Sequence, residues 1–399
     1  MPSENKPAIN GESFALGSER SVIREIFEYG NARAQLVGRE NVYDFSLGNP
    51  AVPTPECIND AIKELVGDSS FNVHGYTSAQ GALPVRESIA DSIRGRFGVA
   101  ASADNIYVTC GAAASLSVTL NAVCSKGDEV IAFAPFFPEY KVFAEGAGAS
   151  FVTVLPDTDN FQINFDDLEK KLGAKTRAVI VNSPNNPSGA VLTKNTVLRL
   201  CAVLREFCQK TGNTVYLISD EPYRELVYDG KEVLYFPSYY ENTIVCYSYS
   251  KSLSLAGERI GYIFVNPAVT AGRDVYSAVC GAARKLGFVC APSLMQYAIA
   301  KNPNAVSDIS VYRQNRDMLY NALCSFGYDC VYPDGAFYLF VRSPIADAKE
   351  FCERARALDL LLVPSDSFGC KGFVRISYCV DGKMIERSLP LFKKLIESL

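Results

Sequence analysis

The sequence is nearly without histidine, because His74 is the only one in 399 residues. A Ser-His-Asp triad, a histidine-rich metal site or a histidine general base would each have to use this one side chain. His74 lies in FNVHGYTSAQG, whose glycine, serine and asparagine residues are typical of a loop. If the chain is an enzyme, we therefore expect another kind of side chain to move protons.

C-x-x-C pairs are absent as well, although the chain has 13 cysteines. Zinc sites made of four cysteines, or of two cysteines and two histidines, need such spacing, so we expect no metal site. An odd number of cysteines spread over a long chain also fits a disulfide framework poorly. Several of them, including Cys246, Cys290 and Cys379, lie in apolar segments, where a free thiol behaves as a small hydrophobic side chain. Reduced cysteines are typical of a cytoplasmic protein.

Long apolar runs are missing too, since none reaches the roughly 18 residues that a membrane-spanning helix needs. The N-terminal segment MPSENKPAINGES is polar and has no apolar core of the kind found in signal peptides. The net charge of −5 and the pI near 5.3 argue against broad binding of nucleic acid, which requires a basic face. We expect a cytoplasmic protein whose partners are neither membranes nor nucleic acids.

Short apolar segments that alternate with helical segments are the main pattern present, and they begin at about residue 80. The strand NIYVTCG precedes the helix AAASLSVTLNAVCSKG, and RAVIVNSP, TVYLISDEP and TIVCYSYSK follow with helices between them. This alternation predicts an α/β fold with a mostly parallel sheet that is covered on both faces. The last third mixes strands such as FVRISYCV with polar helices, which indicates a smaller α+β domain. We expect an arm at 1–20, a small domain at 21–47 and 290–399, and a large domain at 48–289.

Polar side chains recur where the predicted strands of the large domain end, and ligands of open α/β sheets bind at this edge. They are Asn182, Asn185, Asn186, Asp220, Tyr223, Ser248, Ser250 and Lys251, together with the segment CGAAAS, which opens a helix. Taken singly, each has a structural explanation as a turn residue, a helix N-cap or a surface lysine. Their recurrence at one sheet edge favours a binding site.

This set of side chains fits pyridoxal phosphate. The cofactor requires a lysine for a Schiff base, an acid for its ring nitrogen and a cup for its phosphate. Lys251 and Asp220 are candidates for the first two, and the helix N-terminus after CG would offer free N–H groups to the phosphate. Arg259 could add a bidentate contact to the phosphate. A lysine released by a substrate amine can also act as general base, which would explain how the chain manages with one histidine.

The segments SYSKSLSLAGERIGY, NSPNNPSGAV, SDEPYREL and GAFYLFVR…GFVRIS make the resemblance specific. They resemble, in the same order, those of fold-type-I pyridoxal-phosphate enzymes, and in particular class I/II aminotransferases related to aspartate aminotransferase. The resemblance covers nearly the whole chain. It implies a homodimer with shared active sites, whose substrates are amino acids and 2-oxo acids.

The resemblance also assigns roles to residues. It implies that Lys251 forms the Schiff base and shuttles the proton, that Asp220 pairs with the ring nitrogen, and that Asn186 and Tyr223 bind the phenolate oxygen. The implied phosphate and ring contacts are Gly111, Ala112, Ala113, Phe137, Ser248, Ser250, Arg259 and, from the neighbouring subunit, Tyr76. The implied contacts to the substrate, chiefly to its α-carboxylate, are Gly48, Asn186 and Arg375. Phe136 and Tyr140 remain alternatives to Phe137 as the aromatic ring that stacks on the cofactor.

Two departures from the family pattern concern the contacts to the cofactor. The phosphate segment CGAAAS has alanines where the family often has a further glycine and a glutamine or threonine. Backbone donors survive this change, so we still expect cofactor binding, whereas the side-chain contacts of this segment stay open. The chain also has no tryptophan, so a phenylalanine must replace the tryptophan that stacks on the ring in some relatives.

The choice of substrate stays open at this point. Aspartate is the first expectation, because it is frequent in the family, and alanine and aromatic amino acids follow. No residue identifies itself as an arginine that binds a distal carboxylate, and Arg284 is only a candidate, because of its loop-like setting. The same cofactor residues would also support a C–S β-lyase. An effector-binding module of a regulator would need an attached DNA-binding domain, for which the first twenty residues are too short and not basic enough.

Overall fold

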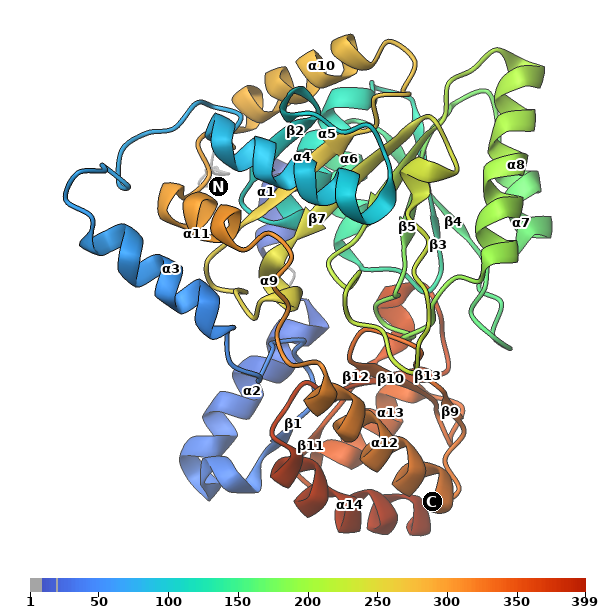
Figure 1. The fold of residues 1–399 in the computed structure, drawn as a ribbon. Helices are drawn as coiled ribbons and strands as arrows, with labels where there is room; N and C mark the ends of the chain where they lie inside the picture. Colours follow the sequence, from blue (N-terminus) through green and yellow to red (C-terminus); the bar gives the residue numbers. More distant parts are fainter. Residues whose placement is uncertain (1–8, 19–20) are drawn as a thin grey trace, which may run out of the picture.

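The computed structural model describes residues 9–18 and 21–399, so part of the predicted arm, residues 1–8 and 19–20, lies outside the described residues. The largest element is a seven-stranded sheet with the strand order β2-β8-β7-β6-β5-β3-β4 (Figure 1). Its strands are β2 (Ile106–Thr109), β3 (Glu129–Phe133), β4 (Ser150–Val154), β5 (Thr176–Asn182), β6 (Tyr216–Asp220), β7 (Thr243–Ser248) and β8 (Gly261–Val265). Only β8 runs antiparallel to its neighbours, so the predicted mostly parallel sheet is confirmed.

Both faces of this sheet are covered by helices, which explains why its strands are apolar throughout. In β5, Ala178 and Ile180 pack in one apolar cluster with α5 and α6, whereas Val179 and Val181 pack in another with α7 and α8. Helix α10 covers the first face and α4 the second. The helices of this part are α3 (Glu56–Gly67), α4 (Leu83–Phe97), α5 (Ala112–Val123), α6 (Glu139–Gly146), α7 (Phe165–Lys171), α8 (Lys194–Thr211), α9 (Tyr249–Ser252) and α10 (Gly272–Leu286).

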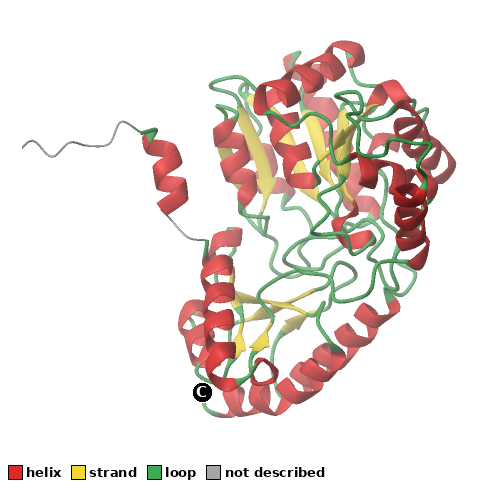
Figure 2. Cartoon of the chain, turned by 90° about the vertical axis from the view of Figure 1, so that its left-hand side faces the viewer, coloured by secondary structure: helices red, strands yellow, loops and turns green. Residues whose placement is uncertain are grey.

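A smaller antiparallel sheet with the order β12-β13-β10-β9 lies below the large one (Figure 2). Its strands are β9 (Cys330–Val331), β10 (Tyr338–Arg342), β12 (Val363–Pro364) and β13 (Phe373–Ser377). A separate pair joins β1 (Tyr43–Asp44) to β11 (Leu360–Leu361) in parallel. The helices around them are α12 (Ser310–Ser325), α13 (Ala348–Arg356) and α14 (Gly382–Glu397). The second, mixed unit that the sequence predicts is therefore present.

The pairing of β1 with β11 supports the proposed grouping of residues 21–47 with the C-terminal part of the chain. Helix α2 (Val22–Val37) precedes β1, and the hydroxyl of Ser21 caps it by accepting from the Arg24 N–H at 3.3 Å. Helix α11 (Ser293–Lys301) packs with α3 and α4 in an apolar cluster on the large sheet. This packing favours a proposed domain boundary after α11 rather than at residue 290.

Helix α1 (Gly11–Ser18) stands clear of the two sheets (Figure 2). It has no buried residues, and its side chains Phe14 and Leu16 are exposed. An isolated helix of this length is marginal in water, since helices of fewer than about 12 residues gain little from their own hydrogen bonds. In the described ranges, no helix combines the length and the apolar character that crossing a membrane requires.

Candidate active site

A pocket of about 610 Å³ opens at the carboxyl edge of the large sheet, and it brings together most of the residues that the sequence singles out. The predicted site residues that line it are Gly48, Ala112, Ala113, Phe137, Asn186, Asp220, Tyr223, Ser248, Ser250, Lys251, Arg259 and Arg375. They come from segments that are far apart in the sequence.

Strand register explains why these residues meet. Asn182, the last residue of β5, pairs with Asp220, the last residue of β6, and Asp220 pairs with Cys246 near the end of β7. Ser248 ends β7 opposite Gly261, which begins the antiparallel strand β8. The residues that precede β8 therefore lie at the same edge as the residues that follow the parallel strands, and this reversal brings Arg259 into the site.

One end of the pocket carries the groups that suit an anion. Gly111 has φ 88° and directly precedes α5, whose first N–H groups have no partner within the helix. A Cβ atom at position 111 would lie 2.9 Å from Nη2 of Arg259 and 3.4 Å from Oγ of Ser248. Arg259 also donates from Nη1 to Ser250 Oγ at 3.3 Å. A cation, hydroxyls and a helix N-terminus thus converge where a phosphate would bind.

Gly261 holds two of these segments in contact. A Cβ atom at this position would collide with the carbonyl oxygen of Tyr247 and would lie 3.0 Å from Cα of Gly111. The strand that leads to Lys251 and the turn that opens α5 therefore approach each other across a residue without a side chain.

Lys251 lies in the short helix α9, which begins directly after β7. Its Nζ donates to the carbonyl oxygen of Gly48 at 2.5 Å. Burial lowers the pKa of this amine to about 8, because the charged form loses its hydration. A lysine with this pKa is partly uncharged near neutral pH and can act as a nucleophile, which a surface lysine does poorly.

Asp220 is 4% exposed and presents its two oxygens differently. Oδ2 accepts a hydrogen bond from the hydroxyl of Tyr140, whereas Oδ1 is buried without a partner. Burial raises the pKa of Asp220 to about 7, and the hydrogen bond from Tyr140 opposes this effect. A buried carboxyl oxygen without a partner is costly unless a ligand satisfies it.

Arg375, on β13, is 2% exposed and brings a buried cation from the small sheet. Its Nη1 donates to Oδ1 of Asn186 at 3.0 Å and its Nη2 donates to the carbonyl of Ser46, but its Nε has no partner. Asp220 Oδ1 and Arg375 Nε are two of the four buried side-chain polar atoms that lack partners among the described residues. The pocket thus contains both an acceptor and a cationic donor that a ligand could satisfy.

Two of the assigned residues lie away from this pocket. Tyr76 is 99% exposed in the loop between α3 and α4. Arg284 is exposed near the end of α10 and does not line the pocket. Neither residue lines the pocket of its own chain.

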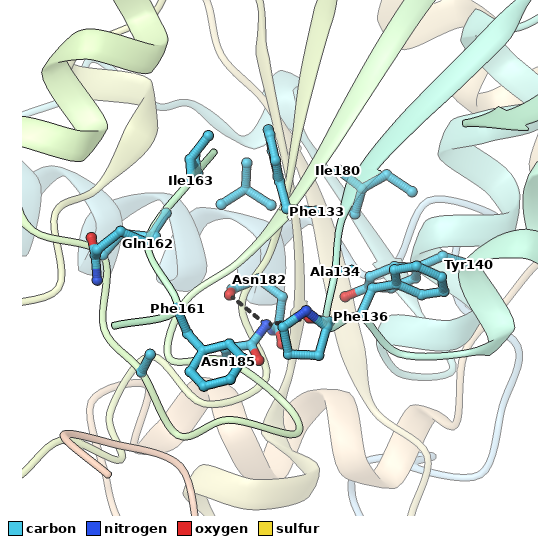
Figure 3. A pocket seen from close by; sticks show the side chains of 14 residues that line it. Phe133, Ala134, Phe136, Tyr140, Phe161, Gln162, Ile163, Ile180, Asn182 and Asn185 are labelled. Atoms are coloured by element: carbon cyan, nitrogen blue, oxygen red, sulfur yellow. Dashed lines mark hydrogen bonds between the residues drawn. The ribbon is translucent and has the colours of Figure 1, made fainter. Parts of the chain in front are cut away.

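The aromatic segment before α6 divides its residues between two cavities. Phe137 lines the large pocket, while Phe136 and Tyr140 line a small cavity of about 30 Å³ beside it (Figure 3). Asn182 and Asn185 bring amide groups to the small cavity, where Asn185 donates to the carbonyl of Pro135 at 3.2 Å. This division favours Phe137 over Phe136 and Tyr140 as the ring that meets a cofactor.

Several lining residues, among them Tyr338, Ile23 and Phe27, were not predicted as site residues from the sequence. The hydroxyl of Tyr338 lies 2.8 Å from that of Tyr223. The guanidinium of Arg375 lies 4.7 Å from the centre of the Tyr338 ring. Ile23 and Phe27 of α2 also line the pocket. Their i, i+4 spacing indicates that they share one face of the helix. Val22 and Ile26 have the same spacing but line a different pocket, together with residues of α13 and β12.

Comparison with known proteins gives the family. The model of "Aminotransferase class I and II" matches residues 40–389. An aspartate aminotransferase of Thermotoga maritima is 30% identical, over 92% of this chain and 94% of its own length. Aromatic-amino-acid aminotransferase 2 of Thermococcus litoralis is 28% identical, over 94% and 96%. The crystal structure of an amino transferase from Eubacterium rectale is 53% identical, covers 98% of this chain and 99% of its own, and superimposes with a TM-score of 0.96. The chain belongs to the class I and II aminotransferases, which are pyridoxal-phosphate enzymes.

Proposed function

We propose that the Lys251 pocket is the catalytic site, at which an amino group moves between an L-amino acid and a 2-oxo acid. The observation that carries the proposal is one enclosed lysine beside two unpartnered buried atoms, Asp220 Oδ1 and Arg375 Nε. Lys251 would be the covalent anchor of pyridoxal phosphate, Asp220 the partner of its ring nitrogen, and Arg375 the group that binds a substrate carboxylate.

The remaining lining residues would hold the cofactor. Ser248, Ser250, Arg259 and the backbone from Gly111 to Ala113 would bind the phosphate, since they form the anion-binding end. Asn186 and Tyr223 would bind the phenolate oxygen, and Phe137 would lie against the ring. Pyridoxal phosphate supplies an aldehyde that condenses with amines and a ring that withdraws electrons from the substrate.

Proton transfer falls to Lys251. When a substrate amine has displaced it, its Nζ is a free base, and its lowered pKa of about 8 suits a group that must take and return a proton near neutral pH. It would remove the proton from the substrate Cα and return it to C4′ of the cofactor. Gly48, whose carbonyl accepts from Lys251, would fix the position of the amine, and Arg375 would fix the substrate through its α-carboxylate.

Aspartate remains the first donor to test, because an aspartate aminotransferase is among the similar proteins. One observation favours a second choice, a donor with an uncharged side chain such as alanine or an aromatic amino acid. Ile23 and Phe27 give the pocket an apolar wall, while Arg284 lies outside it. A distal carboxylate beside this wall would lose hydration without gaining a cation from the described part of the same chain.

The test of the proposed function is a single-turnover screen. The purified protein, loaded with pyridoxal phosphate, should show a near-ultraviolet or visible absorbance band that shifts on addition of its amino-acid donor and is restored by a 2-oxo acid. A protein that remains colourless with added pyridoxal phosphate would refute the proposal. Pyruvate and ammonia formed from cysteine S-conjugates, without transamination of any amino acid, would identify a C–S β-lyase instead.

We further propose a homodimer in a reducing, cytoplasmic setting. The 13 cysteines are all unpaired thiols, which supports the compartment. A tyrosine that is 99% exposed and an α1 helix without buried residues support a second copy of the chain as the partner of both surfaces. In such a dimer, Tyr76 would reach the phosphate in the other subunit.

Mixed dimers test this arrangement. Tyr76→Ala and Lys251→Ala chains should each have little activity, but unfolding and refolding them together should restore up to about a quarter of the wild-type activity. Random pairing makes half of the dimers mixed, and each mixed dimer of this symmetric type has one complete site out of two. If Tyr76 acted within its own chain, the mixture would show no more activity than the two parents measured separately.

A further inference from the structure

The hydroxyl of Tyr140 makes one of the most deeply buried side-chain hydrogen bonds near the pocket. It donates to Oδ2 of Asp220, and the two side chains are 1% and 4% exposed. Tyr140 lies in the first turn of α6, while Asp220 ends β6, so the bond joins residues that are 80 positions apart in the sequence. Tyr140 itself does not line the large pocket.

The bond leaves the two carboxyl oxygens of Asp220 unequal. Oδ2 is occupied, whereas Oδ1 is buried, has no partner and belongs to a residue that lines the pocket. The terminal torsion of an aspartate is broad and roughly two-fold, so backbone geometry alone does not fix the plane of the carboxylate. A donor on one oxygen fixes this plane and thereby the direction in which the other oxygen points.

The surroundings of Tyr140 hold its ring in place independently of the hydroxyl. The ring lies beside Ala134, Phe136 and Ile180 (Figure 3), and it meets the ring of Phe137 edge to face at a centroid distance of 5.7 Å. Removing only the oxygen atom should therefore leave this packing unchanged.

We propose that Tyr140 is a positioning residue, whose hydroxyl holds Asp220 so that Oδ1, as a carboxylate, meets the ring nitrogen of pyridoxal phosphate. The proposal rests on the proposed function of the pocket. A carboxylate keeps the ring nitrogen protonated, which the cofactor needs in order to accept electrons, whereas a carboxylic acid would not. Burial raises the pKa of Asp220 and the Tyr140 hydroxyl lowers it, so the loss of the hydroxyl would favour the acid.

Other groups around Asp220 do not replace this contribution. Glu221, its neighbour on the chain, raises the pKa of Asp220 but is itself paired with Arg224 at 2.5 Å. The hydroxyl of Tyr223 is hydrogen-bonded to that of Tyr338, and the buried thiol of Cys246 on β7 is hydrogen-bonded to Thr119. Of the described groups, only Tyr140 donates a side-chain hydrogen bond to the carboxylate of Asp220.

The experiment compares Tyr140→Phe with Tyr240→Phe in the full-length protein loaded with pyridoxal phosphate. Tyr240 is a matched control, because it is also 1% exposed and its hydroxyl donates to the Val215 carbonyl at 2.8 Å, in an apolar cluster that contains no lining residue of the pocket. The readouts are the ¹⁵N resonance of ring-labelled cofactor, the affinity of the apoprotein for the cofactor, and the separate values of kcat and KM.

In Tyr140→Phe we expect the ¹⁵N resonance to move from the protonated towards the neutral position, together with a roughly tenfold weaker affinity for the cofactor. The kcat should fall about 10- to 100-fold while the KM for the amino donor stays within about threefold, since the donor's carboxylate is bound elsewhere. Tyr240→Phe should leave all of these values near wild type.

Three outcomes would overturn the proposal. A ring nitrogen that stays protonated in Tyr140→Phe, with kcat near that of the control, would leave Tyr140 as a packing residue and the proposed function intact. Equal losses in both variants would show a general effect of buried hydroxyls on stability. A wild-type protein that neither binds pyridoxal phosphate nor transaminates would refute the proposed function, and this inference with it.

Discussion

Lys251→Ala is expected to abolish the absorbance band of the covalently attached cofactor and to lower kcat/KM by at least about 10⁴-fold. Lys251 is the only lysine that lines the pocket in the described part of the chain, so no neighbouring amine can take over the covalent and proton-transfer roles that we propose for it. Absorbance spectra of the loaded protein and steady-state rates measure the two effects. Phosphate, ring and carboxylate contacts do not involve the amine, so the variant should still bind the cofactor, but reversibly.

Lys251→Arg is the matched control, since it keeps a positive charge in the pocket but presents no nucleophilic amine. We expect this variant to be as inactive as Lys251→Ala. A variant of either kind that kept the band and turned over repeatedly would exclude Lys251 as the anchor. A band that survived only in Lys251→Arg would point to an electrostatic role instead.

The lowered pKa of Lys251 adds a pH dependence to this prediction. Only the uncharged amine attacks an aldehyde, and with a pKa of about 8 its fraction rises about eight- to tenfold between pH 7 and pH 9. Capture of pyridoxal phosphate by the wild-type apoprotein should therefore accelerate over this interval and level off above it. A lysine with an ordinary pKa would still be accelerating at pH 9.

Arg375→Ala is expected to raise the KM for every amino acid and 2-oxo acid by about 10²- to 10³-fold, equivalent to about 3–4 kcal/mol. The reason is that the α-carboxylate is common to all of these substrates and Arg375 offers it a buried cation with an unpartnered Nε. Steady-state kinetics with several donors, chosen from the absorbance screen, measure the effect. The band of the bound cofactor should stay unchanged.

Arg375→Lys separates charge from shape. A lysine keeps the cation but loses the planar pair of donors, so its KM values should lie between those of wild type and Arg375→Ala. The residue would have a different role if one substrate alone suffered, because a contact to a side chain affects only the substrates that carry it. Amines without a carboxylate should react equally slowly with all three proteins.

The large sheet and its binding edge could be predicted because both depend on local patterns. Apolar strands between helices fix a mostly parallel sheet, and in such a sheet the residues that follow Asn182, Asp220 and Ser248 must meet at one edge. The direction of β8 was not predictable, because the segment GYIFV fits a buried strand of either direction. Arg259 lies in the site because it comes two residues before a strand of reversed direction, and the local pattern did not contain this reversal.

Contacts between distant segments of the chain could not be predicted from the local sequence pattern. Lys251 meets Gly48, 203 positions away, and Tyr223 meets Tyr338, 115 positions away. Nothing in either local pattern encodes such a meeting, since it depends on how the two parts of the chain pack. The same holds for Tyr140, whose hydroxyl reaches Asp220 only because α6 lies against the sheet.

Gly261 limits how this protein can evolve. Any side chain there would enter the space shared by the strand before Lys251 and the turn before α5. The same few atoms thus affect both the pairing of β8 with β7 and the shape of the pocket end that suits an anion. A substitution at this position would therefore disturb the packing of the sheet and the shape of the pocket at the same time. Ile23 and Phe27 line the pocket from α2, outside the large sheet, so their side chains can change without disturbing the sheet.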